Sequence, residues 1–230
     1  DKNHLSVIFW RLGNEAGPVK NFEAAHDALK AIDTSRPDHY ERNNKIPDVD
    51  STMYPGVDWV ASLAAQKDRK KPFYICEYAH TMNNAMGNLD DYWQAIDSSD
   101  NIIGGSIWEW QDQSIYAKEV NGKVSVDLDR GKAEPGVKKF EAYGGNFGDK
   151  PNDGLFILKG VVFANRDPKP AFAEVKRVYQ DIVVTSKEPS SNRVEVFNKY
   201  FFRNLSDFDV RWSLSENGQA IDEGELPPLD

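Results

Sequence analysis

The sequence contains the stretch Pro72-Phe73-Tyr74-Ile75-Cys76-Glu77-Tyr78-Ala79-His80, an apolar run with a glutamate near its end. A second run of this kind reads Ser6-Val7-Ile8-Phe9-Trp10-Arg11-Leu12-Gly13-Asn14-Glu15. The β-branched and aromatic residues of both runs are typical of strands that are buried on both faces of a parallel sheet. A carboxylate is costly inside such a core, whereas one at the carboxyl end of a parallel strand reaches the crevice where α/β folds bind ligands. The two glutamates are therefore the first candidates for a functional site.

The pattern of residues 1–180 alternates strands with helices. We expect strands at residues 5–12, 38–43, 49–54, 72–79 and 102–111, and helices at residues 21–33, 57–68, 89–97 and 170–179. This alternation predicts parallel βα units. The segment from 112 to 168 is rich in glycine, aspartate, asparagine and lysine. We expect it to be a long ordered loop that contributes to the site.

From residue 181 the pattern changes to the alternation typical of antiparallel strands. We expect strands at residues 181–186, 193–203, 209–216 and 220–225, with Asn217-Gly218 as a tight hairpin turn. About 50 residues are too few to complete an antiparallel sandwich. We therefore expect two domains, residues 1–180 and 181–230, and interpret the chain as a piece of a larger protein.

Composition narrows the function classes. The 230 residues carry 37 acidic and 28 basic side chains, for a net charge of −9, which argues against a nucleic-acid partner. No apolar run approaches the roughly 20 residues that cross a bilayer, so no membrane partner is expected. Cys76 is the single cysteine, which excludes a disulfide within the chain. The residues at the start do not form a signal peptide, and the sequence leaves a cytoplasmic or periplasmic location open.

Several motifs follow one another along the chain. They are Asp1-Lys2-Asn3-His4, Gly13-Asn14-Glu15, Cys76-Glu77-Tyr78-Ala79-His80, Tyr92-Trp93-Gln94-Ala95, Gly104-Gly105-Ser106-Ile107-Trp108-Glu109-Trp110, Tyr143-Gly144-Gly145-Asn146-Phe147-Gly148-Asp149, Asn152-Asp153-Gly154 and Gly160-Val161-Val162-Phe163-Ala164. Together they resemble glycoside hydrolase family 2, and within it the large bacterial β-galactosidases. The resemblance implies an α/β fold. Residues 1–180 would form the second half of a (β/α)8 TIM barrel, strands four to eight, and residues 181–230 would begin an immunoglobulin-like β-sandwich.

The resemblance also implies a reaction. A retaining glycosidase would cleave terminal β-D-galactosides such as lactose, with Glu15 as acid/base and Glu77 as the nucleophile that forms a galactosyl-enzyme. Retention needs the two carboxyl groups about 5–5.5 Å apart. An isolated glutamate would more often be a salt-bridge partner or a helix cap. Two like charges near each other are costly without a use, which favours the catalytic interpretation here.

Four further residues match substrate contacts of the family. Asn14 would hydrogen-bond the sugar 2-hydroxyl, Tyr54 would stand beside the nucleophile, His80 would contact the galactose, and Trp108 would form an apolar wall against the pyranose ring. Each has a structural alternative. The asparagine suits a turn, the tyrosine and the tryptophan suit a core, and a single histidine is more often structural or exposed.

The resemblance implies two metal ions as cofactors. Glu15 would be one ligand of Mg²⁺, with its other ligands upstream of Asp1. Na⁺ would be held by the backbone carbonyl of Phe156 and by an asparagine whose position is occupied here by Lys159. We therefore expect the Lys159 ammonium to occupy or repel the cation, so that activity does not depend on sodium. The alternative is that Lys159 points to solvent.

The sequence departs from the family pattern at other positions as well. Arg11 stands where the family usually has serine or glycine, and we expect it to flank the strand and not the chemistry. Asn83 and Asn84 alter the loop after His80. Relatives are often homo-oligomers, and the isolated chain is expected to be inactive because it would hold half of a barrel. Two alternatives stay open: a family 2 hydrolase for another sugar, of the β-glucuronidase type, and a non-catalytic carbohydrate-binding or structural piece.

Overall fold

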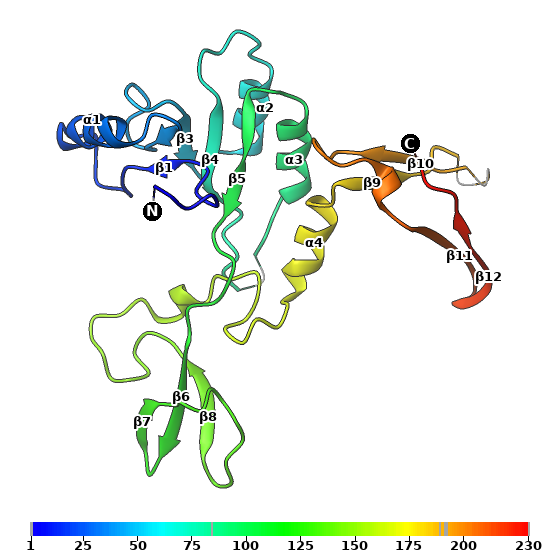
Figure 1. The fold of residues 1–230 in the computed structure, drawn as a ribbon. Helices are drawn as coiled ribbons and strands as arrows, with labels where there is room; N and C mark the ends of the chain where they lie inside the picture. Colours follow the sequence, from blue (N-terminus) through cyan, green and yellow to red (C-terminus); the bar gives the residue numbers. More distant parts are fainter. Residues whose placement is uncertain (1, 84, 189, 191–192, 230) are drawn as a thin grey trace. The chain divides into compact units, whose positions relative to one another are not determined.

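The computed structural model describes residues 2–83, 85–188, 190 and 193–229, so the expectation for Asn84 lies outside the described residues. The chain forms two compact units, Asp1–Val178 and Tyr179–Asp230 (Figure 1). No helix of the described residues has both the length and the apolar character that crossing a membrane requires.

The first unit contains five parallel strands that follow one another in sequence order. They are β1 (Trp10–Arg11), β2 (Asp38–His39), β3 (Asp50–Met53), β4 (Phe73–Tyr78) and β5 (Ile102–Ile107). β1 pairs with β2, and β3, β4 and β5 form one parallel sheet. A parallel bridge from His39 to Val49 continues the order from β2 toward β3. The expected parallel βα organisation is confirmed.

Three helices lie between these strands in the chain and a fourth follows the later segment of residues 115–142, as their apolar spacing predicts. They are α1 (Asn21–Ile32), α2 (Val57–Ala64), α3 (Leu89–Asp97) and α4 (Pro170–Val178). α2 turns Val60 and Leu63 inward, and α3 turns Leu89 and Ile96 inward. These side chains pack with Ile75 of β4 in one buried cluster. Each large side chain buried in this way contributes about 1.5–3 kcal/mol, so the cluster fixes β4 and the glutamate at its end.

The first apolar run differs from its expected structure. Only Trp10–Arg11 forms a strand, and the side chains of Leu5 and Ile8 are 97% and 76% exposed. Among the described residues β1 pairs with β2 alone, so no second neighbour covers this run. The prediction of a fully buried strand over residues 5–12 is therefore wrong. The part of the run that leads to Glu15 still lies on β2, because the Leu12 amide donates to the His39 carbonyl at 3.1 Å.

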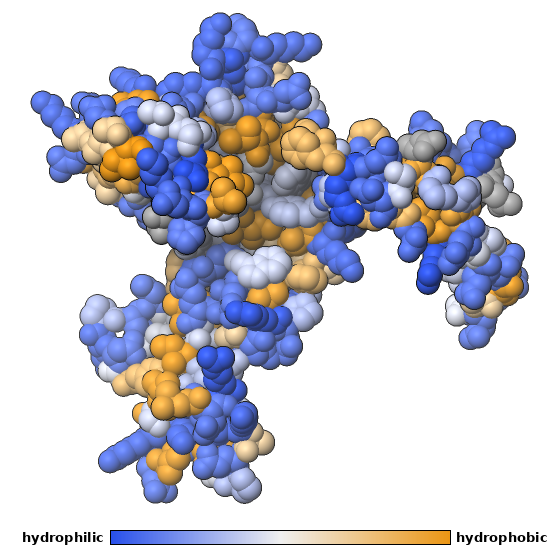
Figure 2. All heavy atoms as spheres, in the orientation of Figure 1, coloured by the Kyte–Doolittle hydropathy of each residue, from blue (hydrophilic) through white to orange (hydrophobic). Residues whose placement is uncertain are grey.

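The segment after β5 is not the loop that its composition suggests. It forms an antiparallel sheet in the order β7–β6–β8, with β6 (Ile115–Val120), β7 (Lys123–Val126), β8 (Lys138–Ala142) and a later 3₁₀ helix, η1 (Gly154–Ile157). Asn121 and Gly122 have φ of 51° and 73°, which suits a two-residue hairpin turn. These short strands mix apolar and polar residues and gave no clear apolar period. Figure 2 shows apolar groups among hydrophilic ones over this sheet, where Ile115 and Val126 are half exposed.

The second unit consists of antiparallel strands. β9 (Ile182–Thr185) pairs with β10 (Glu195–Asn198), and β11 (Val210–Glu216) pairs with β12 (Gln219–Leu226). A short 3₁₀ helix, η2 (Leu205–Asp207), precedes β11. Asn217 and Gly218 have φ of 51° and 81°, so the predicted hairpin turn is confirmed.

Candidate active site

The carboxyl ends of the parallel strands bring together the residues singled out in the sequence. Glu77 lies near the end of β4, Tyr54 directly follows β3, and Trp108 directly follows β5. The Tyr54 amide donates to the Glu77 carbonyl at 2.8 Å, and the Trp108 amide donates to the Tyr78 carbonyl at 2.9 Å. The three strands therefore end side by side at one edge of the sheet, where the Tyr54 and Glu77 side chains meet.

Glu77 is a buried carboxylate that is held on both oxygens. It is 4% exposed. The two terminal nitrogens of Arg11 each donate to Oε1 at 3.3 Å, and the Tyr54 hydroxyl donates to Oε2 at 3.3 Å. A buried charge is tolerated only when it is paired and hydrogen-bonded, and these two partners meet that need. They also fix the plane of the carboxylate.

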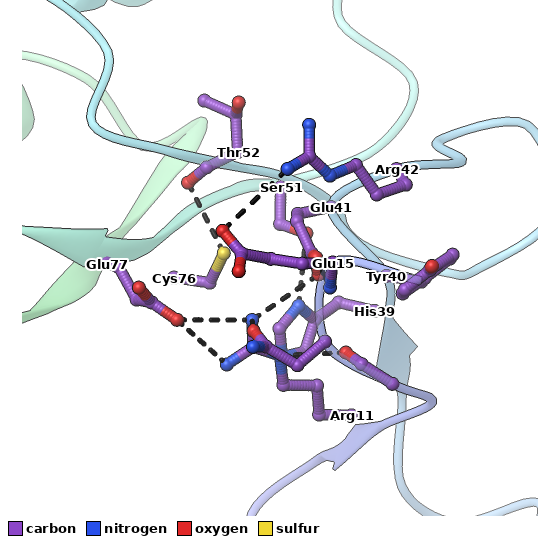
Figure 3. A network of polar contacts seen from close by, with 12 residues as sticks. Arg11, Glu15, His39, Tyr40, Glu41, Arg42, Ser51, Thr52, Cys76 and Glu77 are labelled. Carbon is purple, nitrogen blue, oxygen red and sulfur yellow. Dashed lines mark hydrogen bonds and ion pairs between the residues drawn. The ribbon is translucent and has the colours of Figure 1, made fainter. Parts of the chain in front are cut away.

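Glu15 has a much more open environment. Its side chain is 56% exposed, and Oε1 lies 3.7 Å from Nη2 of Arg42. Its backbone amide donates to Oε1 of Glu41 at 2.7 Å, which ties the loop after β1 to the segment after β2. Figure 3 shows the Glu15 carboxylate directed toward the part of the network that contains Glu77. One carboxylate of the pair is thus enclosed and the other is accessible.

The pKa of Tyr54 is influenced by both carboxylates. Burial raises the pKa of its phenol, and the charges of Glu77 and Glu15 raise it further. Both glutamates therefore lie within electrostatic reach of one hydroxyl, as a carboxylate pair that serves one ligand requires. The phenol stays protonated near neutral pH and can donate to Glu77.

The backbone is strained where these residues leave the strands. Glu15, Tyr54 and Ala79 have φ of 52°, 50° and 50°, in the left-handed region that side chains other than glycine seldom adopt. Each such residue costs on the order of 1–3 kcal/mol and persists where the surrounding structure holds it. Strain of this kind clusters at binding and catalytic sites, which supports a functional role for this edge of the sheet.

His80 and Phe156 extend the site beyond Tyr54. The His80 ring lies 6.0 Å from the Tyr54 ring and 5.6 Å from the Phe156 ring, measured between centroids. Burial lowers the pKa of His80, and the nearby charge of Lys159 lowers it further. The imidazole is therefore neutral near pH 7, and it can both donate and accept a hydrogen bond.

Lys159 is enclosed. It is 6% exposed, so the alternative that it points to solvent is wrong. Its Nζ lies 3.1 Å from Oε1 of Glu109, donates to Gln113 at 3.2 Å, and stands 5.6 Å from the centroid of the Trp108 ring. The structure thus places a buried cation against the indole that was expected to form the sugar wall.

The described residues do not form a metal site by themselves. They contain no group of three or more histidine, cysteine, aspartate or glutamate side chains arranged to hold an ion. Glu15 would supply a single carboxylate, which is less than Mg²⁺ needs. A sodium ion near Phe156 would lie close to the Lys159 ammonium, and like charges repel. These residues therefore do not fit the sodium site that the resemblance implies.

Two residues of the site escaped the sequence analysis. Arg11 was expected only to flank the strand, and this is wrong, because its guanidinium contacts both Glu77 and Asn14. No spacing in the sequence indicates this contact, because the strand ends at Arg11 and the chain turns before Glu15, whose φ is 52°. Glu41 follows β2 and has a side chain that is buried against Arg11, and an acidic residue just after a strand end could have pointed to it.

A sequence model described as the TIM barrel domain of glycosyl hydrolases family 2 matches residues 1–184. The chain belongs to glycosyl hydrolase family 2. A second model, described as domain 4 of β-galactosidase, matches residues 194–229. The expected fold class is thereby confirmed: part of a family 2 TIM barrel is followed by the beginning of a β-sandwich domain.

Curated family 2 relatives cover almost the whole chain. A β-galactosidase of Priestia megaterium is 38% identical over 97% of the chain, and one of Pseudoalteromonas haloplanktis is 35% identical over 98%. The chain spans 20% and 22% of these two proteins. The crystal structure of a glycosyl hydrolase family 2 member from Bacteroides cellulosilyticus matches 98% of the chain and 29% of its own, with a TM-score of 0.50 and 17% identity. That likeness concerns the fold.

Proposed function

We propose that the full-length protein is a retaining glycoside hydrolase that cleaves terminal β-D-galactosides. The observation that carries the proposal is the pair of unlike carboxylates at one edge of the sheet. Glu77 is enclosed between Arg11 and Tyr54, whereas Glu15 is open. The similarity to curated β-galactosidases supports the choice of sugar.

Two steps follow from these positions. In the first, an oxygen of Glu77 attacks the anomeric carbon, the bond to the glycosidic oxygen breaks, and Glu15 gives its proton to that oxygen. In the second, Glu15 takes a proton from water, the water oxygen attacks the anomeric carbon, and the electron pair of the ester bond returns to Glu77. The guanidinium and the phenol beside Glu77 hold its two carboxylate oxygens in place, which suits a nucleophile.

The neighbouring side chains would bind the sugar. Asn14 would hydrogen-bond the 2-hydroxyl, a contact that strengthens as the transition state forms. His80, neutral near pH 7, would contact hydroxyl groups of the galactose, and Trp108 would pack against the C–H face of the ring. Tyr54 would keep Glu77 oriented throughout.

The decisive test is replacement of each carboxylate in the full-length protein. We expect Glu77→Gln to lose turnover of nitrophenyl β-D-galactopyranoside almost completely, about 10⁴-fold or more. A 2-deoxy-2-fluoro-β-galactosyl fluoride should label the Glu77 peptide of the wild type in mass spectrometry. Glu119→Gln is the matched control, because the ion pair of Glu119 in the described part of the chain is with Lys138 on the β6–β8 sheet. Near-normal rates for Glu77→Gln would refute the assignment.

The buried Lys159 favours a second candidate, a family 2 hydrolase for glycosides of uronic acids. Such substrates carry a carboxylate at C6, and an enclosed ammonium beside Trp108 could pair with it. Glu109 already neutralises this ammonium at 3.1 Å, which favours the neutral galactoside. Values of kcat/KM on nitrophenyl β-D-galactoside and β-D-glucuronide separate the two. A higher value on the glucuronide would select the second candidate.

Cofactors and assembly are further proposals. We propose that Glu15 is one ligand of a Mg²⁺ whose other ligands lie outside the described residues, and that Lys159 makes a sodium ion unnecessary. We also propose that lactose is a substrate of the full-length protein and that this protein is a homo-oligomer. Light scattering after gel filtration tests the last point, and a monomeric mass would refute it.

A further inference from the structure

We propose that Arg11 is a positioning residue that holds the Glu77 carboxylate for attack and stabilises it again as the leaving group. The inference rests on the proposed function, because it gives a role to a side chain that the reaction itself does not require. It concerns a position at which this chain carries an arginine just before the Gly13-Asn14-Glu15 motif.

The geometry at Glu77 carries the first step. Nη1 and Nη2 of Arg11 both lie 3.3 Å from Oε1, while the Tyr54 hydroxyl lies 3.3 Å from Oε2. The partners come from different strands, β1 and the end of β3, and they bind different oxygens. Rotation of the carboxylate would break one of these contacts. Arg11 therefore fixes the direction in which Glu77 presents its oxygens (Figure 3).

The same guanidinium also holds the loop that carries the acid/base. Its Nη2 donates to Oδ1 of Asn14 at 2.5 Å, and its Nε donates to the Gly13 carbonyl at 3.0 Å. With Oδ1 turned to Arg11, the NH₂ group of Asn14 is turned away from it and can donate to a sugar hydroxyl. One arginine thus connects the nucleophile, the 2-hydroxyl contact and the segment that leads to Glu15.

The charges around Glu77 make Arg11 the electrostatic partner. The titratable groups that face Glu77 are Arg11, Tyr54, Cys76, His80 and, across the network, Glu15 and Glu41. Burial raises the pKa of the Cys76 thiol to about 11, so this group is neutral near pH 7, as is His80. Glu41 lies 3.4 Å from Nη2 of Arg11 and shares the cation. In the described part of the chain, the ion pair of Glu77 is made with Arg11.

The positive charge of Arg11 has opposite effects on the two chemical steps. In the first step Glu77 becomes a neutral ester, and the attraction to Arg11 is lost. In the second step water attacks the anomeric carbon, Glu15 takes the proton, and the electron pair of the breaking ester bond restores the negative charge beside Arg11. A cation placed where charge develops lowers the barrier. Removing it should therefore slow the second step more than the first.

The test is transient kinetics of the full-length protein with dinitrophenyl β-D-galactopyranoside. For Arg11→Gln we expect kcat to fall about 10- to 100-fold, the KM to fall with it, and a burst of dinitrophenol to appear as galactosyl-enzyme accumulates. Arg11→Lys keeps the positive charge but loses the planar guanidinium. Its kcat and its burst should lie between those of Arg11→Gln and the wild type. Arg69→Gln is the matched control, because Arg69 pairs with Asp50 at 2.5 Å at the opposite end of β3.

The outcomes separate the inference from the proposed function. If the wild type is active and Arg11→Gln has either an unchanged kcat or a lower kcat without a burst, the inference on Arg11 is overturned and the proposed function stands. A wild type that shows neither turnover nor labelling of Glu77 overturns the proposed function and the inference with it. If Arg11→Gln does not fold, Arg11→Lys decides, and wild-type values of kcat and burst for that variant overturn the role of the guanidinium.

Discussion

At the scale of single residues, we propose that the enclosed Lys159 takes the place of a metal ion at the site. Lys159 is enclosed by Glu109, Gln113 and the Trp108 ring, which together satisfy its charge. An ammonium is a compact point charge with three donors, so it can bind hydroxyl oxygens where a sodium ion would accept their lone pairs. We therefore expect the sodium dependence of the activity to be set by this one side chain.

Sodium titration tests this property. We expect the activity of the wild type to change less than about twofold between sodium-free buffer and high sodium, whereas Lys159→Asn should lose about tenfold in kcat/KM and regain part of it on adding sodium. Potassium at equal ionic strength is the control for screening. Strong activation of the wild type by sodium would refute the role given to Lys159.

His39 provides a second prediction, this time for stability. It is buried between the Phe9 and Tyr74 rings and contacts Ser51 at 3.0 Å. Burial lowers its pKa to about 4 from the ordinary 6.5. Below pH 6.5 the unfolded chain binds a proton that the folded chain refuses until about pH 4, so folding becomes less favourable as the pH falls through this window.

The melting temperature of the full-length protein measures this effect. The wild type should lose stability between pH 6.5 and pH 4 more steeply than His39→Gln, whose side chain does not titrate there. The difference between the two curves removes the contribution of other groups. Parallel curves for the two proteins would contradict a buried neutral His39.

Some residues of the site could be predicted from the sequence and others could not. Glu15, Glu77 and Tyr54 were predictable because each stands at or near the end of a predicted strand in a motif that resembles the family, and strand ends meet at one edge. The contact from Arg11 to Glu77 was not, because it depends on how β1 lies against its neighbours and on the rotamer of a long side chain. Lys159 was predictable as a charge, but its burial depends on the fold of the segment after β5.

At the scale of elements, Gly160 shows why the return to the parallel sheet needs a glycine. A Cβ at this position would lie 2.2 Å from the Asp112 nitrogen and 2.4 Å from the Gln111 carbonyl carbon. Both are backbone atoms that cannot move aside. The Gly160 amide also donates to Oδ1 of Asp112 at 2.7 Å, next to Lys159.

We expect Gly160→Ala to destabilise the protein by about 3 kcal/mol, because overpacking against backbone forces the two segments apart. Gly56→Ala is the control, since nothing lies within 4 Å of a Cβ there. Thermal unfolding of the two variants is the measurement. Equal melting temperatures would show that the backbone at Gly160 adapts more easily than its contacts suggest.

The elements themselves were predictable where the apolar period is strong. The helix at 89–97 was expected with the bounds that α3 has, because its inward residues recur every three or four positions. The sheet of β6, β7 and β8 was missed because its inward residues include small alanines, Ala117 and Ala142, which give no strong apolar signal. Burial there comes from pairing and not from large side chains.

At the scale of the whole molecule, the two units have contacts of their own. The buried cluster of the first unit consists of residues up to Val178. In the second unit, Trp212 of β11 packs on Gly224 of β12, where a Cβ would lie 2.8 Å from the indole nitrogen. Substitutions in separate sets of contacts usually have independent effects.

We therefore expect Trp212→Ala to loosen the β11–β12 hairpin without altering the site. Hydrogen exchange of residues 210–226 should become faster, while kcat/KM of the full-length protein stays within about twofold. Mass spectrometry of the exchanged protein and steady-state kinetics provide the two readings. A large loss of kcat/KM would show that the second unit influences the chemistry.

The hydrogen bonds that close the segment after β5 have a consequence for how the protein can vary. The Val161 amide donates to the Glu109 carbonyl and the Asp112 amide donates to the Val162 carbonyl. These two hydrogen bonds join the start and the end of the segment that contains β6, β7 and β8, so the segment is a closed loop. Doubling the length of a closed loop costs only about 0.6 kcal/mol. The sheet of β6, β7 and β8 within this closed loop can therefore gain or lose residues during evolution, or be replaced by protein engineering, while the positions of Trp108 and Lys159 stay unchanged.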